Sequence, residues 1–112
     1  AAKTVDRIVD VFPGAEKDMI RAMLSESLKA VISQTLLKKN GGGRVAAHEI
    51  MMGTPAIRNL IRENKIAQMY SAIQTGQTAG MQTLDQNLQK LVKEGVVSKK
   101  EAQLKATNRD SI

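Results

Sequence analysis

Apolar side chains recur every three or four positions along most of the chain, the spacing expected of helices that bury one side. Glycine and proline interrupt this pattern, most clearly at Pro13 and Gly14, where the first apolar series ends. Gly95 stands where a left-handed residue would close a later helix. The pattern predicts helices over residues 4–12, 15–33, 55–63, 65–75, 81–94 and 99–106.

One interval departs from helical spacing and predicts a hairpin. The runs QTLLKK and RVAAHEIM are compatible with β-strands, and NGGG between them supplies glycines that reach positive φ freely. A hairpin is therefore predicted over 34–52. A chain of 112 residues can bury one core. The predicted fold class is mainly α with one β-hairpin, as a single unit over 1–106 with a frayed tail at 107–112.

Capping residues mark the starts of two predicted helices. Thr54 is placed to accept a hydrogen bond from the first free N–H groups of the helix over 55–63, and Pro55 suits the first helical position. Ser98, with Glu101 three residues later, predicts a capping box at the last helix.

The helix in TPAIRNLIREN presents two different sides. Three apolar residues share one side at i, i+3 and i+4: Ile57, Leu60 and Ile61. Arg58 and Arg62 stand one turn apart on another side. Glu63 follows Asn59 by one turn and is placed to offset part of the positive charge, and Asn64 suits the helix end. Spacing alone equally fits a surface helix with solvated arginines.

Composition excludes several classes of site. The chain has no cysteine, so disulfides and thiolate zinc sites are impossible. Its only aromatic residues are Phe12 and Tyr70, which argues against a stacking surface for single-stranded nucleic acid. No apolar run approaches the roughly 18 residues that cross a bilayer, so direct membrane insertion is not expected. The net charge of +6 favours an acidic partner or nucleotide.

No catalytic, cofactor-binding or metal-ligating residues are predicted. NGGGR lacks both the spacing and the lysine of a P-loop. His48 is the only histidine, and on a strand it would point away from Glu49, so the two are poor partners for acid–base chemistry. Lys38, Lys39 and Arg44 cluster around the glycine turn, where three interpretations stay open: solvated charges, a phosphate contact or a contact with a neighbouring subunit.

The C-terminal segment offers an alternative function. LDQNLQKLVKEGVVSKKEAQLKA has the outline of a helix-turn-helix, and its second helix carries polar side chains of the kind that contact phosphates or bases. These residues are Lys99, Lys100, Gln103 and Lys105. The alternative function is therefore a basic, helical nucleic-acid-binding module. Because the second helix is short, the same segment equally fits a helical hairpin that closes the fold.

Five segments together carry a resemblance to a known family: AAKTVDRIVDVFP, SQTLLKKNGGGRVAAHEIM, TPAIRNLIREN, KIAQMYSAIQTG and GMQTLDQNL. From Ala1 to about Ala106 the chain resembles the C-terminal part of the type IV pilus retraction, or twitching-motility, ATPases of the type II/IV secretion ATPase superfamily. AIRNLIRE matches the named C-terminal motif of that family without a substitution. Its residues are Ala56, Ile57, Arg58, Asn59, Leu60, Ile61, Arg62 and Glu63.

The resemblance implies a hexameric cytoplasmic motor with a PAS-like and a RecA-like domain, peripheral to the inner membrane through the platform of the pilus machinery. Such a motor binds ATP and Mg and powers pilus retraction and twitching motility. The Walker A, acidic, Walker B and histidine boxes would lie before Ala1. We therefore expect the C-terminal portion of a RecA-like α/β domain, lacking the P-loop half and inactive alone, with no nucleic-acid partner.

The resemblance also implies roles for parts of the chain. The motif over 56–63 is expected to couple the motor, with Arg58 and Arg62 making polar contacts and Leu60 and Ile61 packing. If most of the sheet lies outside this chain, the first two helices lack part of their cover. We then expect self-association, or a rearranged helical packing that buries the exposed apolar faces.

Overall fold

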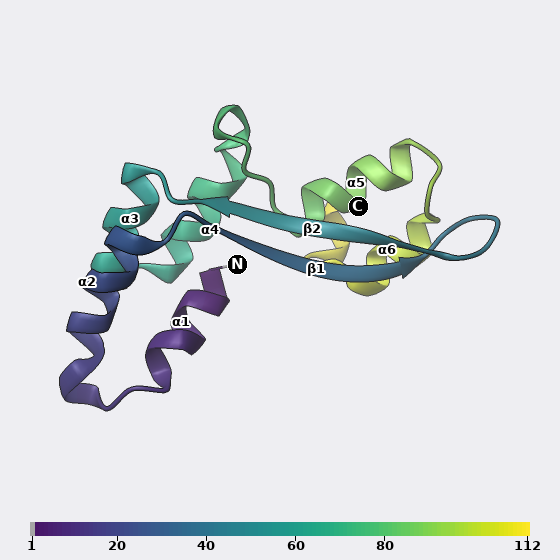
Figure 1. Cartoon of the computed structure of the whole chain (residues 1–112). Coiled ribbons are helices and arrows are strands. Elements are labelled where there is room, and N and C mark those ends of the chain that lie inside the picture. The colour runs from purple at the N-terminus through teal and green to yellow at the C-terminus, as the bar shows by residue number, and fades with distance from the viewer. Residues whose placement is uncertain (1) are drawn as a thin grey trace.

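The computed structural model describes residues 2–112 and has two strands with helices at both ends (Figure 1). The α-helices are α1 (Ala2–Asp10), α2 (Lys17–Ser27), α3 (Pro55–Arg62), α4 (Ile66–Gln74), α5 (Leu84–Lys93) and α6 (Lys99–Lys105). The strands are β1 (Ala30–Lys38) and β2 (Arg44–Met52), and short 3-10 helices cover Gly14–Glu16, Gln77–Ala79 and Arg109–Ser111. The expected class, mainly α with one hairpin, is confirmed.

The hairpin forms the long axis of the molecule. β1 and β2 pair antiparallel over nine residues each, from Ala30 opposite Met52 to Lys38 opposite Arg44. Helices α1 to α4 gather at the end where β2 finishes, and α5 and α6 lie beside the half nearer the glycine turn (Figure 1). The chain is accordingly elongated, with extents of 51 × 28 × 23 Å.

Two hydrophobic clusters lie along this axis, one at each group of helices. The first consists of the buried residues Ala2, Val5, Met51, Ile57, Ile61, Met69, Ile73 and Met81. The second consists of Leu37, Ala47, Leu88, Leu91, Val97 and Ala102. Each cluster includes a β2 residue, so one strand contributes to both parts of the core.

The helix predicted over 15–33 is wrong after Ser27. The backbone becomes extended at Leu28, with φ −72° and ψ 124°, and β1 starts at Ala30. Val31 is half-buried and Ile32 is exposed, which is the period-two alternation of a strand. Leu24, Leu28 and Val31 happen to fit helical spacing, but the ladder to β2, formed with residues distant in sequence, determines the structure.

The helix predicted over 81–94 begins too early, because it starts at Leu84. Gln82 instead forms an isolated β-bridge with Ile50, exchanging backbone hydrogen bonds of 2.9 and 3.1 Å. Thr83 then caps α5 in a reciprocal capping box with Gln86. Gln82 therefore extends the edge of the hairpin, and residues 81–83 lie outside the helix.

The capping box predicted at Ser98 is only half formed. The Ser98 hydroxyl accepts a hydrogen bond from the Glu101 backbone N–H, at 3.1 Å, as predicted. The Glu101 carboxylate does not return to Ser98 but accepts a bond from the Lys38 N–H, at 3.2 Å. Glu101 thereby joins α6 to the end of β1, a link between residues that local sequence cannot specify.

The tail predicted to be frayed at 107–112 is held against α5. The Thr107 and Asn108 N–H groups donate to the Asp85 carboxylate at 2.8 and 2.9 Å, and Arg109–Ser111 forms a turn of 3-10 helix. The prediction is wrong because a buried acid far back in the sequence supplies the acceptor that these backbone groups need.

The turn between β2 and α3 depends on a glycine. A Cβ on Gly53 would meet the Leu28 carbonyl oxygen far inside van der Waals contact, and the Gly53 N–H donates to the Lys29 oxygen at 2.7 Å. We expect Gly53→Ala to lower the free energy of unfolding by about 1–3 kcal/mol, because backbone must move. Urea denaturation measures this loss.

Gly14→Ala is the matched control for that measurement, since nothing lies within 4 Å of a Cβ at Gly14. Equal stability of the two variants would contradict the close approach at Gly53.

Candidate functional site: helix α3 and its arginines

Helix α3 has a well-defined start. The Thr54 hydroxyl accepts a hydrogen bond from the Ile57 N–H at 3.3 Å, and Pro55 occupies the first turn, as predicted. The preceding Gly53 is bonded to Lys29, at the turn between α2 and β1. The cap and this neighbouring bond fix both the position and the direction of the helix.

The apolar side of α3 packs as its spacing predicts. Ile57 and Ile61 are completely or almost completely buried, and Leu60 is half-buried against the same cluster. The helix lies against α2 and α4 (Figure 1). This packing determines which side chains of the motif face outward.

The arginines lie on the polar side but in different environments. Arg62 is exposed, and so are Ala56, Asn59 and Glu63. Arg58 is half-buried, and its Nε has no hydrogen-bond partner among the described residues, although it is inaccessible to solvent. An unpaired buried donor is costly, so Arg58 differs from an ordinary solvated arginine.

The charge of the two arginines is not offset by the motif's own acid through an ion pair. Glu63 instead pairs with Lys65, at 3.4 Å. Both partners are about half exposed, so this ion pair contributes little to stability. Asn64 has the left-handed φ of 57° and terminates the segment where predicted.

The other candidate residues lie away from α3. Lys38, Lys39 and Arg44 lie at the turn end of the hairpin, opposite to the end that carries α3 (Figure 1). The ring of His48 contacts Gln34 across the strands at 3.2 Å, so His48 is bonded to a strand neighbour. These residues do not join the arginines of α3 in one site.

Within residues 2–112 no group of three or more acidic or histidine residues is arranged to hold a metal ion. The helices in this range are also too short or too polar to cross a membrane.

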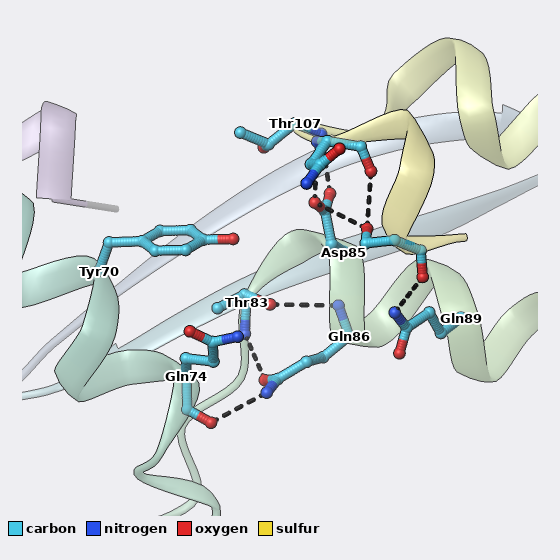
Figure 2. A pocket seen from close by; sticks show the side chains of 9 residues that line it. Tyr70, Gln74, Thr83, Asp85, Gln86, Gln89 and Thr107 are labelled. Carbon is cyan, nitrogen blue, oxygen red and sulfur yellow. Dashed lines mark hydrogen bonds between the residues drawn. The ribbon is translucent and has the colours of Figure 1, made fainter.

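Sequence reasoning missed Asp85, which lies at the edge of a hollow of about 280 Å³ between α4, α5 and the tail (Figure 2). Asp85 is only 5% exposed and binds the tail. Nearby, the Gln86 amide donates to the Gln74 carbonyl oxygen at 2.9 Å and completes the capping box with Thr83. These polar groups already bind one another, so the hollow is structural. In the sequence, the only signal for this hollow is an acidic residue, Asp85, in the first turn of α5.

Comparison with curated proteins relates the chain to pilus motors. It is 72% identical over 106 residues to the type IV pilus retraction ATPase PilT of Pseudomonas aeruginosa, covering 95% of the chain and 31% of that protein. It is 63% identical to a twitching motility protein of Neisseria gonorrhoeae, covering 100% of the chain and 30% of the relative. No family model matches the chain.

Solved structures give the same relation. The chain superposes on the pilus retraction motor PilT with bound ADP at a TM-score of 0.88, with 43% identity, covering all of the chain and 31% of that structure. The chain also shares the fold of the Legionella pneumophila ATPase DotB, with a TM-score of 0.75 and 22% identity. This superposition covers 93% of the chain and 28% of DotB.

The chain thus corresponds to the C-terminal part of the PilT-type pilus retraction ATPases in sequence and in fold. It spans about a third of the length of the relatives that it matches. The nucleic-acid-binding alternative receives no support from these likenesses.

The tail contacts predict the effect of removing Asp85. We expect Asp85→Ala to free residues 107–112 and to lower the free energy of unfolding by about 2 kcal/mol, because hydrogen bonds to a charged acceptor are lost. Limited trypsin digestion should then cleave faster after Lys105 and Arg109.

Asp110→Ala is the control, because Asp110 is exposed in the same tail. Unchanged cleavage in Asp85→Ala would show that Asp85 does not hold the tail.

Proposed function

We propose that this chain is the C-terminal output segment of a hexameric motor ATPase that powers type IV pilus retraction and twitching motility. The identity of 72% to a pilus retraction ATPase and the TM-score of 0.88 to a retraction motor support this assignment. Helix α3, with the sequence AIRNLIRE over Ala56–Glu63, couples movement of the motor to its output.

The buried, unpaired Nε of Arg58 is the observation that supports a coupling role most directly. A donor that water cannot reach needs an acceptor, and none is present among the described residues. A carboxylate or carbonyl from a neighbouring subunit, or from the rest of the motor, would satisfy it. Contact with such a group would link α3 to a surface outside this chain.

The other residues of the motif either pack in the core or are exposed to a partner. Ile57, Leu60 and Ile61 anchor the helix in the first cluster. Ala56, Asn59, Arg62 and Glu63 are exposed and are free to meet a partner surface. The anchored side would make the helix move as one body with α2 and α4, so that a force on the exposed side reaches the core.

In the proposed parent motor, this segment belongs to a RecA-like domain. The motor lies at the cytoplasmic side of the inner membrane, next to the platform of the pilus machinery. ATP and Mg would be bound by parts of the motor outside this chain. The structure of a retraction motor with bound ADP supports nucleotide binding by the parent. The chain alone would not hydrolyse ATP.

A chimera in which this chain replaces the matching third of P. aeruginosa PilT tests the coupling role. With Arg58→Ala and Arg62→Ala together, we expect twitching to fall about tenfold or more while the affinity for ATP changes less than about twofold. Uncoupling would leave a distant phosphate site intact. Twitching zones and nucleotide binding by the purified chimera measure the two effects.

Arg7→Ala is the matched control, because Arg7 is an exposed arginine on α1 outside the motif. If the double variant loses nucleotide affinity and twitching equally, α3 is chiefly structural and the coupling role fails. Thermal unfolding of each chimera separates such losses from misfolding.

Self-association of the chain is a second proposal, supported by exposed apolar side chains on and beside the first two helices. Val11 is 78% exposed, Met19 57% and Met23 56%. We expect reversible association of the chain, weakened about tenfold or more when all three become serine, because less apolar area is buried. Sedimentation equilibrium gives the dissociation constants.

Leu104→Ser is the control, since Leu104 is 61% exposed on α6 at the other group of helices. A chain that stays monomeric up to millimolar concentration would refute self-association through α1 and α2.

A further inference from the structure

The positive charge of the chain is concentrated at one end. The turn and helical segments over 38–44 and 84–112 contain nine basic and four acidic residues, a net charge of +5 out of +6 for the whole chain. Six exposed cations flank the hairpin turn and α6, and we call them the basic end: Lys38, Lys39, Arg44, Lys99, Lys100 and Lys105.

The basic end has one part on the hairpin turn and one part on α6, and hydrogen bonds hold these two parts together. Beyond the bond from Lys38 N–H to Glu101, Asn40 in the turn donates twice to the link between α5 and α6. Its backbone N–H reaches the Val96 oxygen at 2.8 Å, and its side-chain amide reaches the Gly95 oxygen at 3.0 Å. The cations of the turn and of α6 therefore form one surface rather than two mobile groups.

Three of these cations surround a hollow. Lys38 and Arg44 are directly opposite in the hairpin register, and Lys105 approaches from α6. The hollow, of about 160 Å³, is also lined by Leu36, Leu37 and Glu101. Among the described residues none of the three cations forms an ion pair, so their charge is available to an anion.

Exposed apolar side chains stand beside the cations. Leu104 is 61% exposed and follows Lys100 by one helical turn, so both lie on one face of α6. Leu36 is 47% exposed at the rim of the hollow. Clustered cations bordered by exposed leucines resemble the surface of a protein that lies on a bilayer.

We propose that the basic end docks on an anionic lipid bilayer, with lipid phosphate seated between Lys38, Arg44 and Lys105 and with Leu104 entering the headgroup region. Five of the six cations are lysines, which act as point charges and suit diffuse attraction to a charged surface better than bidentate binding of carboxylates. The aromatic residues Phe12 and Tyr70 lie outside the basic end, so it lacks a platform for stacking bases.

Co-sedimentation with vesicles tests this docking. The 112-residue chain should bind vesicles of phosphatidylcholine with one-third phosphatidylglycerol, and binding should weaken steeply with added salt. Binding to pure phosphatidylcholine should be negligible. Changing Lys38, Arg44 and Lys105 to glutamine should reduce partitioning about fivefold per cation, on the order of 100-fold for all three.

The matched control changes Lys3, Arg7 and Lys29 to glutamine, which removes the same charge from exposed cations outside the basic end. The proposal predicts a much smaller loss for this variant, and circular dichroism shows whether both variants are folded. Leu104→Asn should weaken binding further without changing the net charge.

Other outcomes overturn the proposal. Equal losses in both triple variants would mean that only net charge matters. Binding to polyglutamate or duplex DNA without binding to the anionic vesicles would assign the basic end to an acidic protein or a nucleic acid. Full displacement by millimolar inorganic phosphate would indicate a site for soluble phosphate. The coupling role of α3 does not require this docking and would stand after any of these results.

Discussion

The nine-residue ladder between β1 and β2 is the constraint on which the rest of the structure depends. A two-stranded hairpin is marginally stable alone. Here its side chains enter both clusters, with Met51 in the first and Leu37 and Ala47 in the second. The outer edge of β2 is covered by Gln82 and by Asn87, whose side-chain oxygen accepts from the His48 N–H at 2.7 Å. The ladder thus joins two helical groups, each packed around its own part of the core.

The same ladder positions α3. The last residues of β2 lead through Gly53 directly into the Thr54 cap of α3. The bond from the Gly53 N–H to the Lys29 oxygen closes this end of the hairpin. Because Ile57 and Ile61 then enter the first cluster, the direction of Arg58 and Arg62 follows from backbone geometry rather than from contacts of the arginines. A rigid base for α3 is what its proposed coupling role requires.

Sequence predicted the parts of this structure that local chemistry specifies. The cap at Thr54, the left-handed stop at Asn64 and the buried side of α3 depend on residues a few positions apart. The failures all involve distant partners. The predicted helix over 15–33 runs past the end of α2 because the start of β1 pairs with the end of β2, with Ala30 opposite Met52, and this partner is distant in sequence. Asp85 and Glu101 bind backbone groups that no local pattern identifies.

The exceptional environment of Arg58 also required the structure, because spacing gives the face of a side chain but not its burial. Other buried polar groups are satisfied within the described chain. Asp85 accepts bonds from the tail, and the Ser25 hydroxyl donates to the Ala22 oxygen at 2.7 Å. Arg58 Nε alone is buried without a partner there. Stability would favour a fully solvated or fully paired guanidinium. A guanidinium that is neither supports the proposal that a group outside the described chain supplies the missing acceptor.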